Sequence, residues 1–345
     1  MDFGFRYRHG VHAMQASFVD PAAVEAWDAW FRWREGNELR DVTIDATWSR
    51  VTRALCALAP TEPAQHEQQV GEAISSWRLL PDARVLAGAG QRHFVWPSDA
   101  LYVGINLARF VSLPFTAKAS FQHQALAEIA RLALRLIDDM YLAADGPAGA
   151  PPQLGILGLA DALAMLGVDY ASEAGAQTAA QIAREFAAAS LEATCELAAE
   201  RGNRASDALI KAALHRAERL ELAPAQRQRV CRHGLRLAPL TAIAAQPRLA
   251  LVANNVADAI APLSGEKVPY QIVGANGQRR VTASGFAITL WRQLGARADE
   301  TAFPFSTAAT AGDDGVARIR AAMTPWFDQI ADALPQDTDR LTVSG

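Results

Sequence analysis

Apolar residues recur along most of the chain at the spacing of an amphipathic helix. The segment after Asp20-Pro21 begins with an N-cap residue and a proline at the first helical position, and its aromatic side chains then recur at helical spacing. These periodicities predict helices over 21–35, from 43 or 45 to 58, and over 120–143, 156–166, 173–200, 205–220, 224–232, 285–294 and 314–333.

Short apolar runs between the helices predict a few strands. Residues 84–90 are expected to form a short extended piece that ends in a glycine turn, and 240–244 and 249–253 are expected to be short buried strands. Two further runs flank an Asn-Gly dipeptide at 276–277, where both residues tolerate positive φ, so a β-hairpin is predicted near 269–283. The expected class is an α-rich α/β protein.

Composition is typical of a globular protein, because half of the residues are apolar, 20% are charged and the mean hydropathy is near zero. A net charge of -4 without a basic stripe argues against a nucleic-acid partner. No run approaches the roughly 18 apolar residues of a membrane span, and the N-terminus lacks the apolar region of a signal peptide. Three cysteines without CxxC spacing predict a cytoplasmic protein with reduced thiols.

Several stretches, taken in order, resemble the large subunit of ribonucleotide reductase. The most similar is Gly155–Gly167, continuing through Tyr170–Ala174, and it is most like the coenzyme-B12-dependent class. Ile105–Val111 resembles the segment that follows the second redox cysteine of the family. The other similar stretches are Thr47–Val51, Leu80–Gly90, His233–Arg236 and Leu240–Ala244.

The resemblance implies a fold and a chemistry. The family has a ten-stranded barrel whose finger loop carries a thiyl-radical cysteine, while a cysteine pair reduces the ribose, and an Asn and a Glu hold and deprotonate it. Here the resemblance implies a truncated remnant of that barrel over 83–345, after an N-terminal helical region over 1–82. A linker is expected near 144–152, and the small β-hairpin lies in the C-terminal part.

The sequence departs from the family at the positions that carry its chemistry. His93 stands where the first redox cysteine is expected, and Ala100 stands where the second is expected. Six residues separate these two positions, whereas the family has several hundred there, and the finger motif has no counterpart. Residues 245–248 read Ala-Gln-Pro-Arg in place of the family's phosphate loop, so no glycine is left to let backbone N–H groups close on a phosphate.

The cysteines that are present cannot be assigned to the family's roles by pattern. Cys56 and Cys195 lie in amphipathic helices, where a buried inert thiol is expected. Cys231 is expected at a partly buried helix end, with a reactive thiol beside Arg232 as the alternative. His9 and His12 have no third ligand nearby in the sequence, so no metal site is predicted.

Other polar residues are candidates for contacts. Asp138 and Asp139 are expected to end a helix in solvent, with a substrate contact as the alternative. Candidates for a residual nucleotide or anion contact in the region of the family's substrate are His93, Asn106, Arg248, Asn254 and Asn255. Candidates for a partner interface, with core packing as the alternative for two of them, are Trp27, Trp30 and Trp33.

Three classes of function follow from these observations. The leading hypothesis is a catalytically inactive reductase-like protein that binds an intact reductase subunit or a nucleotide. The second is an accessory or split subunit of an adenosylcobalamin-dependent ribonucleoside-diphosphate reductase, contributing to deoxyribonucleotide synthesis with a partner chain that brings the cysteines. The third is a different enzyme on the remnant scaffold, with His93 or Cys231 as its acid–base or nucleophilic group.

Cofactor and partner expectations follow from the same comparison. No cofactor is expected, although the resembled class uses adenosylcobalamin. Truncation of a barrel leaves strand edges and apolar faces that must be covered, so self-association or docking onto another subunit is expected.

Overall fold

The computed structural model describes residues 18–59, 64–97, 99, 101–144, 151–238, 240–275, 277–294, 302–331 and 341–343. His9, His12, Ala100 and most of the expected linker lie outside the described residues. The described helices are α2 (Pro21–Trp30), α3 (Ile44–Cys56), α4 (Ala64–Ser75), α5 (Ala83–Gly88), α6 (His123–Ala143), α7 (Leu159–Met165), α8 (Glu173–Arg201), α9 (Asp207–Arg219), α10 (Pro224–His233), α11 (Pro247–Val252), α12 (Phe286–Gln293) and α13 (Gly312–Met323), with 3-10 turns η1 (Leu107–Phe110) and η2 (Thr324–Trp326).

The described strands are short. They are β1 (Arg34–Glu35), β2 (Glu38–Leu39), β3 (Leu79–Pro81), β4 (Tyr102–Asn106), β5 (Val111–Ser112), β6 (Ser120–Phe121), β7 (Gln153–Leu157), β8 (Ala242–Ala244), β9 (Val268–Gly274), β10 (Gly277–Ala283), β11 (Gln329–Ala331) and β12 (Leu341–Val343). The helix-rich α/β class expected from the sequence is confirmed, because the described helices greatly exceed the strands in length.

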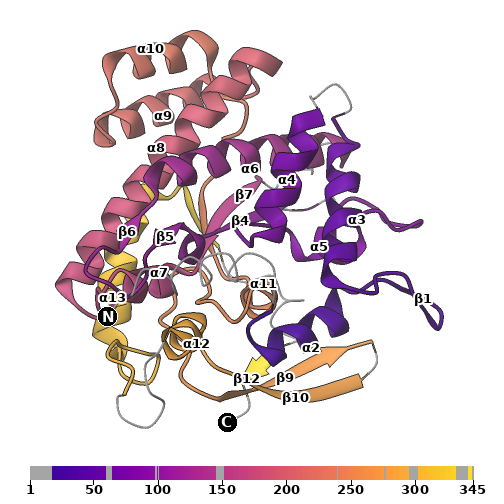
Figure 1. Ribbon diagram of the computed structural model, residues 1–345. Helices are drawn as coiled ribbons and strands as arrows, with labels where there is room; N and C mark the ends of the chain where they lie inside the picture. Colours follow the sequence, from indigo (N-terminus) through magenta and orange to yellow (C-terminus); the bar gives the residue numbers. More distant parts are fainter. Residues whose placement is uncertain are drawn as a thin grey trace.

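A mostly parallel array of strands runs in the order β3, β4, β7, β8 and β11. β4 and β7 lie near the centre of the molecule (Figure 1). β4 pairs in parallel with β7, β7 meets β8 at one parallel bridge between Leu154 and Thr241, and β8 pairs in parallel with β11. β3 runs antiparallel to β4. Across the described residues these strands form an open layer, and no barrel closes.

Two glycines allow one aromatic ring to lie against the central strands. Gly104 of β4 pairs with Gly155 of β7, and Tyr102 is 1% exposed beside them. A Cβ atom at Gly155 would lie 2.5 Å from Cε2 of Tyr102, and one at Gly104 would lie 2.9 Å from its Cε1. Because the ring occupies this space, a larger residue at either position would force the strands or the ring to move.

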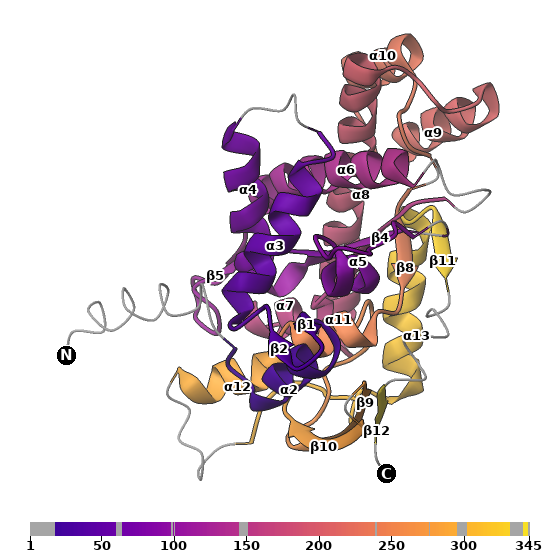
Figure 2. The same cartoon turned by 90° about the vertical axis from the view of Figure 1, so that its right-hand side faces the viewer.

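The helices cover this layer and join the N-terminal part to it. α6, which follows β4, packs against α8, and α13 packs along α8 beside β8 and β11 (Figure 2). α2 packs against α11 and against the antiparallel pair β9 and β10, which lies where the hairpin was predicted. One continuous core cluster contains residues from both sides of position 82. No described helix combines the length and apolar character that a bilayer crossing requires.

A smaller layer projects from the far end of α8. α9 and α10 pack there around a second apolar cluster that contains Leu191, Cys195, Ala217 and Val230 (Figure 1). Within α9 only Ala213 and Ala217 are buried, and within α10 only Val230 is buried. This layer therefore buries much less apolar surface than the central one.

Several predicted elements are wrong in type. Residues 84–90 were expected to be extended, but α5 forms because Asp82 accepts a hydrogen bond from Arg84 N at 2.9 Å as its N-cap. Residues 249–253 were expected to be a strand, but Pro247 begins α11 there. The helix predicted over 156–166 begins instead at Leu159, after β7. Short apolar runs do not distinguish a strand from a buried helix.

Candidate functional site

A ligand-binding site is expected at the carboxyl ends of the parallel strands, because ligands of open α/β sheets bind at that edge. Asn106 ends β4, Gly158 follows β7, and Gln246 follows β8 two residues after its end. Gly158 has a φ of +70°, and its backbone N–H donates to Ala257 O at 2.7 Å. The structure thus brings the segments 106–108, 158–161 and 254–257 together.

Asn106 is buried and turns its side chain toward β7. Its Oδ1 accepts a hydrogen bond from Ala108 N at 3.2 Å, and a Cβ atom at Gly158 would lie 2.5 Å from the same oxygen. Within the described part of the chain, its Nδ2 has no hydrogen-bond partner. Asn106 is fully buried, so a ligand could reach this amide only after local rearrangement.

Asp161, on the first turn of α7, holds this edge together. Its Oδ2 accepts a hydrogen bond from Ala257 N at 2.6 Å, and its Oδ1 accepts one from Ala287 N at 2.8 Å. Burial of the carboxylate raises its pKa to about 6, against the lowering effect of these two N–H donors. Both oxygens are used by the backbone, so Asp161 positions two loops and offers no free oxygen to a ligand.

In the segment expected to replace the family's phosphate loop, the protein's own groups take up the backbone donor. Gln246 N, the backbone donor ahead of α11, donates to Oδ1 of Asp258 at 2.7 Å. Pro247 has no N–H, so this carboxylate occupies the position where a phosphate would need donors. The Arg248 guanidinium lies 5.3 Å from the ring centroids of both Trp30 and Phe31, and so ties α11 to α2.

Asn254 and Asn255 form the turn after α11, with φ of +70° and +57°. The Oδ1 atom of Asn254 accepts a hydrogen bond from Val19 N at 2.7 Å, and Nδ2 of Asn255 donates to Ser264 Oγ at 3.0 Å. Asparagine tolerates the left-handed region better than most residues. These internal contacts account for both residues without a ligand.

His93 lies apart from this group. It is exposed in the turn that follows α5. Among the described residues, no hydrogen bond or ion pair joins it to Asn106, Arg248 or either asparagine of the turn. The structure therefore brings together Arg248, Asn254 and Asn255 near α11, but it does not bring His93 to them.

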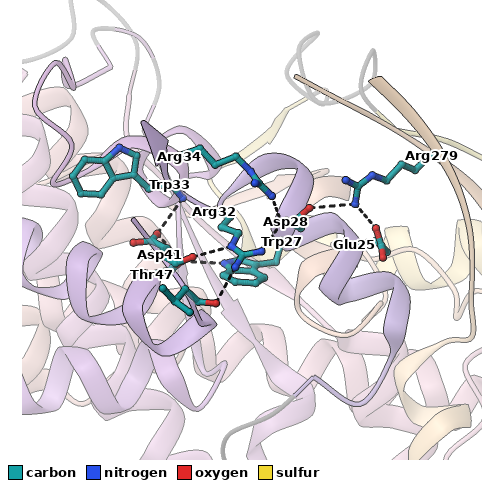
Figure 3. A network of polar contacts seen from close by, with 10 residues as sticks. Glu25, Trp27, Asp28, Arg32, Trp33, Arg34, Asp41, Thr47 and Arg279 are labelled. Atoms are coloured by element: carbon teal, nitrogen blue, oxygen red, sulfur yellow. Dashed lines mark hydrogen bonds and ion pairs between the residues drawn. The ribbon is translucent and has the colours of Figure 1, made fainter. Parts of the chain in front are cut away.

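Of the three tryptophans that were candidates for a partner interface, Trp27 and Trp30 are buried and Trp33 is half-buried. Trp27 and Trp30 are 6% and 7% exposed, and each indole N–H is satisfied internally, by Thr47 Oγ1 at 3.0 Å and by Val273 O at 3.0 Å. Figure 3 shows Trp27 and Thr47 beside Asp41, which also accepts a hydrogen bond from Trp33 N. Two of these indoles are core residues because α2 is covered on that face by α3, α11 and the β9–β10 pair.

Asp138 and Asp139 also differ from the expected solvated helix end. They are buried on α6, where Arg201 Nη1 lies 2.9 Å from Asp138 Oδ2 and 2.6 Å from Asp139 Oδ1. Arg236 Nε donates to Asp138 Oδ1 at 2.7 Å. The pair is buried because two arginines, one from α8 and one from the segment before β8, neutralise it.

The three cysteines lie on three different helices, and none lies on a strand of the central layer. Burial, helped by Glu67, raises the pKa of the Cys56 thiol to about 11, and burial also raises the pKa of Cys195. Cys231 is exposed on α10, not partly buried as expected. Among the described residues, no three His, Cys, Asp or Glu side chains group together as a metal site would require.

Sequence reasoning missed a large cavity. It has a volume of about 1140 Å³ and lies between α4, η1 and α6, with Arg78 and Arg109 in its wall. The sequence feature that could have indicated this cavity is the position of the two arginines. Arg78 lies just before β3, and Arg109 lies just after β4.

Comparison with known families is consistent with this strand arrangement. The family model described as ribonucleotide reductase, barrel domain, matches residues 103–331, which is more than half of the chain. A comparison with curated proteins found no match. The matched residues include β4, β7, β8 and β11, the four parallel strands of the central layer. The chain therefore belongs to the ribonucleotide reductase family of large subunits, through its barrel domain.

Proposed function

We propose that this chain is a non-catalytic member of the reductase family that acts by binding, either to an intact reductase subunit or to a nucleotide. The observation that carries the proposal is the position of the thiols. The carboxyl ends of β4, β7 and β8 present Asn106, Gly158 and Gln246, whereas the cysteines are on α3, α8 and α10.

Ribose reduction needs a sulfur radical in contact with the sugar and two further thiols that supply electrons. The three thiols lie on three separate helices, and none of them stands at the carboxyl ends of the parallel strands. The same deficit argues against a role for adenosylcobalamin, since its adenosyl radical would find no thiol at the strand ends. We therefore assign no chemical role to adenosylcobalamin in this chain.

The open strand layer supports the binding role. The family's barrel has more strands than the described layer. β11, whose Ile330 is 52% exposed, ends that layer on one side, whereas β3 at the other end is buried beside α4 and α5. A strand edge like that of β11 favours pairing or coverage by another chain. The expected partner is a reductase subunit, because the surface of such a subunit is expected to match that of a member of the same family.

The first experiment measures deoxyribonucleotide formation by the purified chain with adenosylcobalamin, a dithiol and ribonucleoside diphosphates. We expect no product, while an intact reductase in the same buffer should give it. Product formed by this chain alone would refute the proposal.

The second experiment mixes the chain with a full-length reductase from the same cells and follows co-elution and the rate of that enzyme. We expect a complex at micromolar concentration or a changed rate. Product that appears only in a mixture with a chain that is inactive by itself would favour the split-subunit alternative. If the chain binds neither the reductase nor any nucleotide, the binding proposal has no support.

A further inference from the structure

The cavity between α4, η1 and α6 has the size and the charge of a site for a small anion. Its volume of about 1140 Å³ is large enough for a nucleotide-sized molecule. Four arginines line it, Arg78, Arg109, Arg131 and Arg135, against two glutamates, Glu72 and Glu128. The wall therefore carries an excess of positive charge within a protein whose net charge is -4.

Two of these arginines are held in place by the central strands. Arg78 precedes β3, its N–H donates to Ala73 O at 3.0 Å, and its carbonyl accepts from Asn106 N at 3.1 Å. Arg109 lies in η1, directly after β4, and its Nε donates to Ser76 O at 2.9 Å. Because β3 and β4 are antiparallel, Arg78 and Arg109 both stand at the carboxyl end of β4.

The charges of the four arginines are not balanced equally. Arg131 pairs with Glu196 at 3.0 Å, and Arg135 pairs with Glu200. Within the described residues no carboxylate lies within ion-pair distance of Arg78, whose guanidinium instead lies 5.8 Å from the ring centroid of Phe110. Burial and the nearby charge of Arg78 lower the pKa of Arg109 to about 10.

A buried histidine in the same wall is also short of a partner. His66, on α4, is 6% exposed, and across the described residues its Nε2 has no hydrogen-bond partner. Because this nitrogen is itself buried, a ligand in the cavity could reach it only after local rearrangement.

We propose that this cavity binds a small molecule through a phosphate or pyrophosphate group, with Arg78 and Arg109 as the principal contacts. Arginine matches phosphate because its planar guanidinium donates two parallel hydrogen bonds to two oxygens. The site is independent of docking onto a reductase, so its failure would leave that part of the proposed function intact.

Calorimetric titration of the full chain tests the proposal with inorganic phosphate, pyrophosphate, ADP and citrate as probes. We expect saturable binding of pyrophosphate and ADP, with citrate weaker. ADP tighter than pyrophosphate would identify a nucleotide site, and equal affinities would identify recognition of the phosphates alone. Absence of saturable binding by phosphate, pyrophosphate and ADP up to about 10 mM, the weak end of the millimolar affinity range, would overturn the proposal.

Variants at Arg78 locate the binding. Arg78→Gln should weaken pyrophosphate binding at least tenfold, roughly the worth of one charged hydrogen bond, and Arg78→Lys should weaken it less because the charge remains. The matched control is Arg232→Gln, which removes one exposed positive charge from α10 and should leave the affinity within about twofold, the size of a screened surface effect. Circular dichroism confirms that each variant is folded. Equal weakening by the control, or no change in Arg78→Gln, would overturn the assignment.

Discussion

At the scale of single residues, Asp161 shows how a buried carboxylate can organise a strand edge and still cost stability. Its pKa in the folded state, about 6, lies above the ordinary aspartate pKa of 3.8 because the carboxylate is buried. The folded state therefore binds the proton more tightly than the unfolded chain does, and the contribution of this group to the free energy of unfolding falls as pH rises from about 4 to about 6. A shift of this size corresponds to about 3 kcal/mol.

Asp161→Asn removes this pH-dependent contribution. The amide keeps one oxygen acceptor but turns an NH2 group toward a backbone N–H, so the variant should be less stable at pH 4, by about 1–3 kcal/mol. The deficit relative to the natural chain should then shrink as pH rises to 7, as measured by urea unfolding at each pH. Asp313→Asn removes an exposed carboxylate and controls for net charge. A deficit that grows with pH would contradict the assignment.

At the scale of elements, the longest helices were predicted best, but α4 was missed and the helix predicted over 314–333 ends at Met323. The periodicity over 173–200 extends through many turns, so α8 agrees with the prediction almost to the residue. α11 has six residues, and its apolar run Leu249–Val252 is compatible with a buried strand until Pro247 is placed at the helix start. β7 was absorbed into a predicted helix because its apolar run continues into α7 without a polar break.

The candidate site was only partly predictable for a related reason. The absence of thiols and of a phosphate loop at the family's positions is an expectation drawn from the residue types alone. The burial of Trp27 and of Asp138 is not visible, because it depends on partners such as Thr47 and Arg236 that are distant in sequence. Arg78 and Arg109 escaped notice for the same reason, since only the pairing of β3 with β4 places them together.

The prediction at the scale of elements concerns the stability of the contact between α6 and α8. Asp138→Asn leaves Arg236 and Arg201 without their shared buried carboxylate, so it should lower the free energy of unfolding by about 3–5 kcal/mol. Glu200→Gln breaks the exposed pair with Arg135 between the same two helices, and it should cost less than about 1 kcal/mol. Chemical denaturation of both variants makes the comparison. Similar losses would show that the buried cluster contributes no more than a surface pair.

At the scale of the whole molecule, the chain divides its apolar contacts unequally. The central strands and their covering helices share one large cluster, whereas α9 and α10 are held to α8 by a small one. Regions with few buried apolar contacts open at lower free energy than the global unfolding. The amides of α9 and α10 should therefore exchange with solvent before those of β4 and β7.

Val230→Ala tests whether this opening is local. Val230 is 2% exposed and is the buried side chain of α10, so removing two methyl groups should cost about 1–3 kcal/mol at that layer. Hydrogen exchange followed by mass spectrometry should show faster exchange in peptides from 207–233 and unchanged exchange in β4 and β7. Acceleration throughout the chain would mean that the two clusters unfold together. A separate opening would instead allow α9 and α10 to move during docking while the strand layer shared with the reductases stays intact.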